Sequence, residues 1–290
     1  RGIFARFAEK LREKKVKDIL KLLKERILIC DGAMGTMLQD CGLSAGECPE
    51  YWNITRPGDV TDVHKSYVNA GADIILTNTF GANRLKLKKF NLDDKLKDIN
   101  LSAVANAIKA SKKSTFVAGD IGPTGSLLEP LGFLKESEAY EVFKEQVVVL
   151  CEGGIDLIVI ETMISIEEVY LATKAAKENC NLPVAALMTF DIGDSDIRTV
   201  MGVDVTTMVK KLNEVGADII GSNCGNGIEN MVKIIRAIRN ETDKFIITEP
   251  NAGMPVLKEG KVIYDGTPGI MASYVKELIS AASTTIAVPC

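Results

Sequence analysis

The sequence is poor in residues that many kinds of site depend on. It contains one histidine, His64, in 290 residues, which excludes catalytic schemes with two histidines and metal sites built from histidine. Lys and Arg number 35 against 39 Asp and Glu, for a formal net charge of -4, so we expect no nucleic-acid partner. No apolar run reaches the ~18 residues that a membrane-spanning helix needs, so we expect no membrane partner either.

The N-terminal stretch lacks the apolar core and the cleavage site of a secretory signal. Apolar residues recur there at helical spacing instead, namely Ile3, Phe4, Phe7, Leu11, Ile19 and Leu22. We therefore expect an amphipathic helical extension over residues 1–25 that packs against the main domain, although its basic character would also suit a membrane surface. The seven cysteines form no compact framework, and without an export signal we expect a cytoplasmic protein with reduced thiols.

One phrase occurs three times along the chain. It reads AGADIILT at 70–77, GGIDLIVIE at 153–161 and VGADIIGS at 215–222. Each copy places a glycine, one further residue and an aspartate before an apolar run. The glycine can end a helix in the left-handed conformation, and the run is apolar on both faces, as in a parallel sheet covered by helices.

Further apolar runs complete an alternating pattern. They predict strands over 26–31, 114–120, 183–190, 244–250 and 284–288. Helices are predicted over 61–70, 95–112, 136–152, 166–179, 204–215, 228–239 and 268–281. Eight strands alternating with helices in roughly 250 residues favour an α/β fold of the (β/α)8 TIM-barrel type over residues 26–290. A doubly wound open sheet is the rival, but no G-x-G-x-x-G follows the first strand.

Polar residues gather where the predicted strands end. In a barrel these ends share one mouth, where the chemistry of the fold is carried out. The residues are Asp31, Thr77, Asn78, Thr79, Asp120, Glu161, Thr162, Thr189, Ser222, Asn223, Cys224, Glu249 and Asn251. Asp31, Glu161 and Asn223 are the functional candidates that we favour, while several of the hydroxyl residues could instead cap the helices that follow.

Glycine-rich loops lie at the same end of the predicted strands. They are DGAMGT, GDIGPTG, NCGNG and PNAGMP, and glycine lets the backbone approach a ligand closely. With no Lys or Arg beside them and no P-loop consensus, they favour a carboxylate or an amino acid held by backbone N–H groups over a phosphate. The loop over 40–59 carries the only tryptophan, Trp52, and is either a lid over the mouth or a surface segment packed by its own aromatic residues.

The remaining histidine and cysteines have simpler interpretations. His64 lies on a predicted helix remote from the mouth, so we expect a surface or packed residue. Cys30 and Cys151 read as small apolar fillers. Cys41 and Cys48 have no histidine nearby, which argues against a metal site between them.

Several of these stretches together resemble a known family. They are ILICDGAMGTMLQ, YWNITRPGDVTDVHKSYVNAGADIILTNTFGAN, GDIGPTG, GSNCG and EPNAGMP. They are similar to the homocysteine S-methyltransferase family, most of all to the N-terminal homocysteine-binding domain of cobalamin-dependent methionine synthases, from about Ile27 to about Ala281. The resemblance implies a (β/α)8 barrel that binds Zn²⁺ through three cysteines and methylates the thiol of L-homocysteine to form methionine.

The resemblance also assigns roles to single residues. Cys224, which the residues alone leave as a nucleophile, a metal ligand or a buried filler, matches the family's first zinc cysteine. Asp31, followed by Gly32, and Glu161 match carboxylates near the amino group of homocysteine. Further substrate-binding residues are expected at Thr77, Asn78, Thr79, Asn223, Glu249 and Asn251.

The sequence departs from the family at the other two zinc ligands. The family draws them from a Gly-Gly-Cys-Cys-Gly motif, which is absent from KELISAASTTIAVPC. Either Pro289 and Cys290 stand where the cysteine pair should be, so that one ligand is lost, or a segment is missing between about Ala281 and Ala282. We favour the second interpretation. Cys224 and Cys290 are then the metal-ligand candidates that this sequence offers.

The methyl donor is not encoded in these residues. The methionine synthase resemblance implies methylcobalamin on a separate module, recharged from methyltetrahydrofolate on a folate-binding module of the same or another chain. The alternatives are a stand-alone methyltransferase that uses S-methylmethionine or another donor, and a catalytically inactive barrel that binds an amino acid or a partner domain. A non-metal barrel enzyme of the aldolase or phosphate-isomerase kind would need a lysine or a phosphate loop at the mouth, and we find no lysine at a predicted strand end.

Overall fold

The computed structural model describes residues 18–193, 196–225, 227–253, 256–258, 261–263 and 266–282. Most of the predicted N-terminal extension, the predicted strand over 284–288 and Cys290 lie outside these residues. Within the extension, α2 (Ile19–Leu22) forms a single helical turn, and the N–H of Lys21 donates to the side chain of its N-cap residue Asp18. No helix in the described part of the chain is long and apolar enough to span a membrane.

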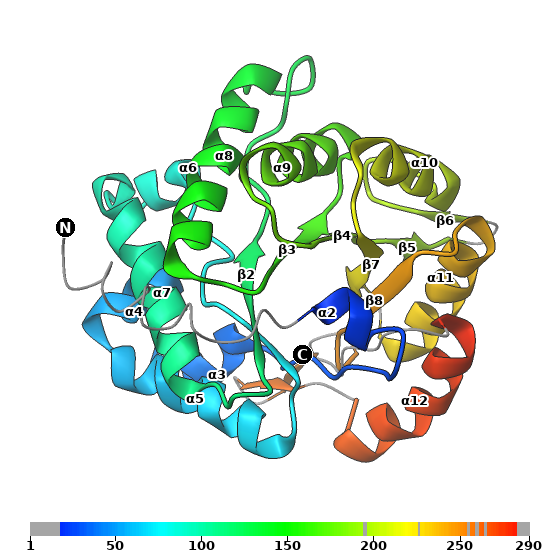
Figure 1. Cartoon of the computed structure of the whole chain (residues 1–290), viewed down its shortest axis with the longest axis horizontal. Helices are drawn as coiled ribbons and strands as arrows, with labels where there is room; N and C mark the ends of the chain where they lie inside the picture. Colours follow the sequence, from blue (N-terminus) through cyan, green and yellow to red (C-terminus); the bar gives the residue numbers. More distant parts are fainter. Residues whose placement is uncertain are drawn as a thin grey trace.

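Six parallel strands form the central sheet. In spatial order they are β1 (Ile74–Leu76), β2 (Phe116–Ile121), β3 (Leu157–Met163), β4 (Val184–Met188), β7 (Ile219–Cys224) and β8 (Phe245–Pro250). The predicted first strand is reduced to a parallel bridge between Cys30 and Ile74 at the edge of β1. The strands curl around a centre (Figure 1), and the chain has the predicted TIM-barrel-like α/β fold.

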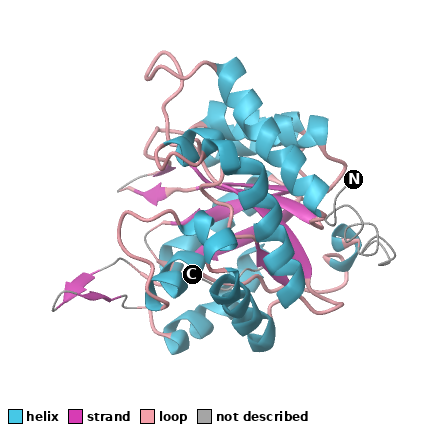
Figure 2. Ribbon diagram, turned by 90° about the vertical axis from the view of Figure 1, so that its left-hand side faces the viewer, coloured by secondary structure: helices cyan, strands magenta, loops and turns pink. Residues whose placement is uncertain are grey.

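Helices cover the outside of the curved sheet (Figures 1 and 2). The long ones are α5 (Pro57–Ala70), α7 (Leu96–Ala110), α8 (Glu136–Gly153), α9 (Ile166–Asn179), α10 (Val205–Val215), α11 (Ile228–Glu241) and α12 (Pro268–Ala282). These seven correspond to the seven predicted helices, with ends that differ by at most a few residues. The 3.6-residue periodicity of their apolar positions therefore located them correctly, because one face of each helix packs on the sheet.

Shorter elements fill the loops. They are α3 (Met34–Asp40), η1 (Pro49–Tyr51), α4 (Trp52–Thr55), α6 (Arg84–Lys88), η2 (Asp93–Lys95) and two antiparallel pairs, β5 (Asp191–Ile192) with β6 (Ile197–Arg198) and β9 (Val256–Lys258) with β10 (Lys261–Ile263). Of the two alternatives for the loop over 40–59, a lid or a segment packed by its own aromatic residues, the contacts of the loop favour the second. Its Trp52 is buried in a cluster with Leu38 and Val60, and Asn53 donates to the carbonyl of Asn78 at 2.8 Å.

The strands are buried on both faces, and alternate residues serve two separate cores. Along β3, Ile158 and Ile160 pack in the layer between sheet and helices, whereas Leu157 and Val159 pack inside the barrel. The inner core also includes Ile19 of α2, Leu23 directly after α2, and Phe116, the first residue of β2. The α2 turn thus covers the N-terminal end of the barrel, close to the centre of the view in Figure 1.

The repeated phrase ends helices as predicted. Gly71, Gly154 and Gly216 follow α5, α8 and α10 with φ of 110°, 91° and 84°, all in the left-handed region. This conformation costs glycine little because it has no Cβ. Each glycine lets the chain turn from a helix into the strand that begins three residues later.

The aspartate of the phrase joins neighbouring strands at the end opposite the mouth. Asp156 accepts the N–H of Val117 at 2.8 Å, and the N–H of Asp156 donates to the carbonyl of Val117 at 2.7 Å. Asp218 forms the same two hydrogen bonds with Val184: its carboxylate accepts the N–H of Val184 at 2.8 Å, and its N–H donates to the carbonyl of Val184 at 2.9 Å. Each carboxylate thereby satisfies a backbone donor at the beginning of the adjacent strand.

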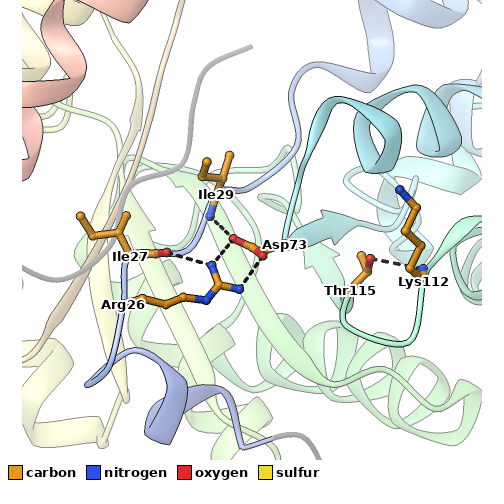
Figure 3. Close-up of polar contacts among 6 residues, drawn as sticks. All are labelled: Arg26, Ile27, Ile29, Asp73, Lys112 and Thr115. Carbon is orange, nitrogen blue, oxygen red and sulfur yellow. Dashed lines mark hydrogen bonds and ion pairs between the residues drawn. The ribbon is translucent and has the colours of Figure 1, made fainter.

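Asp73 has the same role in the first copy of the phrase (Figure 3). Its carboxylate accepts the N–H of Ile29 at 3.1 Å and forms a two-pronged ion pair with Arg26, with N–O distances of 2.7 and 2.8 Å. This pairing holds the predicted first strand against β1, although only one bridge forms there. The three aspartates are therefore structural residues rather than members of the mouth.

Two cysteines depart from the prediction of reduced thiols. Cys151 near the end of α8 and Cys180 just after α9 form a disulfide, with their Cα atoms 6.6 Å apart. The prediction that Cys151 is an apolar filler was wrong, because the packing of α8 against α9 brings together two residues that lie 29 apart in sequence. Cys30 is buried and free, as expected for a filler, and Cys41 is exposed and free.

Candidate active site at the barrel mouth

Four carboxyl groups meet at the C-terminal ends of the strands. They belong to Asp31, Asp120, Glu161 and Glu249. Burial is the largest cause that raises the pKa of each group, and repulsion from Glu161 raises the pKa of the other three further. Groups that perturb one another in this way lie in one site. The predicted convergence of carboxylates at the mouth is therefore present in the structure.

The four groups differ in how their oxygens are used. Asp31 Oδ2 accepts the N–H of Leu76 at 3.0 Å. Asp120 Oδ1 is buried without a hydrogen-bond partner in the described part of the chain, and burial together with the neighbouring Glu161 raises the pKa of Asp120 well above its usual range. Glu249 Oε1 is buried without a hydrogen-bond partner in the described part of the chain. A cluster with this surplus of acceptors is suited to a cationic group such as an ammonium ion.

Asn223 connects the carboxylates to Cys224. Its Nδ2 donates to Glu161 Oε2 at 2.5 Å and to Thr162 Oγ1 at 2.7 Å, and its Oδ1 accepts the N–H of Thr162 at 2.8 Å. The same Nδ2 lies 3.4 Å from Cys224 Sγ, and Thr162 Oγ1 lies 3.7 Å from it. The amide therefore fixes the relative positions of a carboxylate, a hydroxyl and a thiol.

The backbone at this point is unusual. Thr162 and Cys224 have φ of 58° and 59°, in the left-handed region that β-branched residues in particular avoid. The pairing of β3 with β4 also shifts register between Ile160 and Met163. Bulges next to active sites re-aim side chains, and strained residues of this kind persist where the surrounding contacts fix them. Both features mark this end of β3 and β7 as the functional end.

Cys224 itself is poorly suited to act as a free nucleophile. Burial and the neighbouring Glu161 raise the pKa of Cys224 to about 11. Its thiol therefore keeps its proton at neutral pH, whereas nucleophilic attack needs the thiolate. Of the roles that the sequence allows, ligation of a metal ion agrees better with this environment, because a bound cation reverses the electrostatic cost of the thiolate.

Comparison with known proteins identifies the family. The sequence profile of the homocysteine S-methyltransferases matches residues 28–289. The chain belongs to this family. It is 27% identical to the methionine synthases of Mycobacterium leprae (strain TN) and of Mycobacterium tuberculosis (strain ATCC 25618 / H37Rv), over 94% of this chain and 24% of each relative. It therefore spans about a quarter of the length of these relatives.

A solved structure supports the fold of this chain. The metallated form of the Escherichia coli homocysteine methyltransferase MmuM superposes with a TM-score of 0.75 at 22% identity, covering 93% of this chain and 94% of that one. The resemblance that the sequence motifs indicated is thus confirmed at the level of family and fold. Membership of the family makes the protein a methyltransferase.

The predicted threonines at the end of β1 bind to the neighbouring strand. Thr77 and Thr79 share a hydrogen bond of 2.7 Å between their hydroxyls. The hydroxyl of Thr79 donates to the carbonyl of Asp120 at 2.7 Å, and the N–H of Asp120 donates to the hydroxyl of Thr77 at 3.1 Å. These contacts position Asp120. A direct contact of either threonine with substrate stays a prediction.

The predicted amides are also engaged in the methyltransferase fold. Asn78 donates to the carbonyl of Pro49 at 2.9 Å, and Asn251 donates to the carbonyl of Gly225 at 3.2 Å. Asn251 thereby ties the loop after β8 to the loop after Cys224. Gly32 follows Asp31 at the mouth and is partly exposed. Substrate binding by these residues stays a prediction.

Two lysines lie near the site at positions that the sequence did not indicate. No Lys or Arg was expected beside the glycine loops, but α6 places Lys86 and Lys89 against Gly125, where a Cβ would lie 3.5 Å from Lys86 Cε and 3.3 Å from Lys89 Nζ. The Lys86 ammonium also opposes the rise in the pKa of Glu161. The available signal was the i, i+3 spacing of the two lysines in NRLKLKK, which puts them on one side of a helix.

The described residues do not form a zinc site by themselves. A catalytic zinc ion takes three protein ligands, and no group of three His, Cys, Asp or Glu side chains in the described part of the chain is placed to hold a metal ion. Cys224 contributes one thiol at the mouth. Cys290, the second predicted ligand, lies outside the described residues.

Proposed function

We propose that this protein transfers a methyl group to the thiol of L-homocysteine and so forms methionine. In this reaction a bond forms between the homocysteine sulfur and the methyl carbon, the bond from that carbon to the donor breaks, and the thiol loses its proton. The observation that carries the proposal is the joint presence of a carboxylate cluster and a thiol, held 2.5 and 3.4 Å from the same Asn223 amide nitrogen. A small amino acid with a thiol presents the matching groups.

The carboxylates supply recognition of the amino group. An ammonium ion bound between Asp31, Glu161 and Glu249 would meet several acceptors, of which Glu249 is buried and the other two are partly exposed. Hydrogen bonds to charged groups contribute about 1.5–3 kcal/mol each. Burial and repulsion from Glu161 raise the pKa of Asp120, which favours its neutral form and so reduces the repulsion among the four carboxyl groups. We therefore assign Asp31, Glu161 and Glu249 to the ammonium and the glycine loops to the carboxylate of homocysteine.

We further propose that Cys224 would be one ligand of a zinc ion, which would supply a positive charge that favours the thiolate form of a bound thiol. The support is the position of Cys224 behind Asn223, the environment that keeps its free thiol protonated, and the metallated form in which the related Escherichia coli enzyme was solved. The remaining ligands must come from residues outside the described part of the chain, with Cys290 as one candidate.

Methylcobalamin is the donor that we propose. The relatives named methionine synthase are about four times as long as this match. Their additional length is enough for separate cobalamin-binding and folate-binding modules. For this protein we propose such modules in the same chain or in another chain. S-methylmethionine or another small donor is the alternative, in which case the barrel would act alone. We place the reaction in the cytoplasm, where methionine biosynthesis requires no export.

Zinc content and homocysteine binding test the proposal together. We expect stoichiometric zinc in the purified protein, loss of zinc in Cys224→Ser, and retention in Cys41→Ser, whose cysteine is exposed and free. Glu161→Gln should weaken homocysteine binding by about 10- to 150-fold in calorimetry, because it removes one charge-assisted hydrogen bond. Zinc that stays bound in Cys224→Ser refutes the ligand assignment. Homocysteine binding without methyl transfer from any donor would favour the inactive barrel.

A further inference from the structure

A pocket of about 230 Å³ lies beside the barrel mouth and has no role in homocysteine binding as assigned above. It is bounded by η1, by the turn after β1 and by α6. Its lining includes Pro49, Glu50, Phe80, Lys86, Lys89 and Phe90. The pocket combines apolar walls with two lysines, which is the composition expected of a site for a small organic anion.

Lys86 is the central group of the pocket. Its side chain is partly buried, and its ammonium stands 4.2 Å from the centre of the Phe80 ring. Within the described part of the chain the ammonium has no hydrogen-bond acceptor and no ion-pair partner. Contact with an aromatic face stabilises a cation less than a carboxylate or phosphate does. The ammonium can therefore gain stability from an anionic ligand.

A second cation lies close to the first. Lys89 follows Lys86 by three residues, and both side chains rest on the loop after β2 at Gly125, which has φ of 76°. A Cβ there would lie 3.3 Å from Lys89 Nζ, tighter than most real Cβ contacts. The glycine allows the loop to turn and the lysines to approach it. Two ammonium groups thus face the same small space.

The acidic group of the pocket is already engaged. Glu50 accepts the N–H of Gly81 at 2.7 Å through one oxygen and the thiol of Cys48 at 3.2 Å through the other. The thiol is the donor, because burial and Glu50 raise the pKa of Cys48 to about 12. Glu50 also attracts the Lys86 ammonium electrostatically, but the pocket lining sets two ammonium groups against this one carboxylate, whose two oxygens already accept hydrogen bonds.

We infer that this pocket binds the carboxylate or phosphate group of a second small molecule, with Lys86 and Lys89 as the anion ligands and Phe80, Phe90 and Pro49 as apolar walls. The pocket adjoins the carboxylate cluster, since Lys86 acts electrostatically on Asp120 and Glu161. Two ligands of opposite charge would then lie side by side at the mouth. In the alternative form of the proposed reaction, in which a small donor is used and the barrel acts alone, the second ligand is that methyl donor, and this assignment of the occupant rests on the proposed function.

Direct titration tests anion binding without any assumption about methyl transfer. Inorganic phosphate and benzoate are added separately at low ionic strength, and binding is followed by calorimetry. We expect saturable binding of at least one probe. Phosphate alone points to a phosphate-bearing ligand, and benzoate alone to an aryl carboxylate. If neither probe binds saturably, Lys86 only balances the nearby carboxylates and the inference is wrong.

Variants on α6 assign the binding to the pocket. Lys86→Met should weaken the affinity for the bound probe by at least about 10-fold, which is the effect of losing one charge-assisted contact. Lys86→Arg keeps the charge and should keep the affinity. Lys88→Met is the matched control, because Lys88 lies on the same helix and is exposed. Equal binding by wild type and Lys86→Met overturns the site even if the probes bind elsewhere.

Lys89→Met separates this inference from the proposed function. Since Lys89 is exposed at the rim, we expect unchanged homocysteine affinity, weaker phosphate or benzoate binding, and a raised KM for the methyl donor. Weaker anion binding with an unchanged donor KM overturns the donor assignment. Failure of the protein to methylate homocysteine would refute the proposed function and leave the titrations with phosphate and benzoate unaffected.

Discussion

Lowering the pH from 7 to 5 should destabilise this protein through one side chain, His64. The imidazole lies on α5 and is fully buried. Neither of its nitrogens has a hydrogen-bond partner in the described part of the chain. Burial lowers the pKa of His64 from 6.5 to about 4, because the charged form would lose its hydration without gaining a partner. The folded state therefore holds the neutral ring.

The magnitude follows from the difference between the two pKa values. A group whose pKa is lower in the folded state contributes stability above its unfolded pKa and loses it as the pH falls through the folded pKa. For His64 the loss begins near pH 6.5 and ends near pH 4. At pH 5 it amounts to about 2 kcal/mol, and the full shift corresponds to about 3 kcal/mol.

The presence of a single histidine makes the assay simple. The imidazole proton signal in the NMR spectrum should not titrate between pH 8 and pH 5.5. Urea unfolding at pH 7 and pH 5 should show that the stability of the wild type falls relative to His64→Leu by about 2 kcal/mol. Comparison with the variant cancels the carboxyl groups that also titrate in this range. A ring that titrates near pH 6.5, or an unchanged difference between the two proteins, would refute the reasoning.

Two further predictions concern the scaffold. Reduction of the Cys151–Cys180 disulfide should lower the free energy of unfolding by about 3–4 kcal/mol, which is the chain-entropy value for a loop of this length. In the same denaturant titration the control variant Cys41→Ser should be as stable as the wild type. Equal stability with and without reductant would contradict the pairing. Asp218→Ala should lower the free energy of unfolding by about 1–3 kcal/mol, because the N–H of Val184 loses its acceptor. An unchanged melting temperature would show that water replaces the carboxylate with no loss of stability.

The regular elements were predictable because their causes are local. The helix predicted over 166–179 occurs as α9 at Ile166–Asn179, since apolar spacing and the capping residue Ser165 both lie within the segment. The glycines of the repeated phrase are a second local signal. The strand over 26–31 was less predictable, because a strand exists only through its neighbour, and Cys30 forms a single bridge.

The sequence predicted which residues lie at the candidate site better than it predicted the contacts between them. Strand ends share one mouth in a barrel, so Asp31, Glu161 and Asn223 could be grouped from the sequence. Their detailed roles depend on distances. The amide of Asn223 reaches Glu161, 62 residues away in sequence, and the register shift between β3 and β4 beside Glu161 has no signature in the residues.

The sequence by itself determined the alternation of helices and strands, the end of the barrel that carries polar groups, and the family. Each of these rests on spacing within a segment or on residues that follow a strand directly. Only the tertiary structure decided that Cys151 pairs with Cys180, that buried His64 has no hydrogen-bond partner in the described part of the chain, and that Lys86 of α6 lies over the Phe80 ring. These facts depend on which outer helices and loops pack together, and that packing is a property of the whole chain.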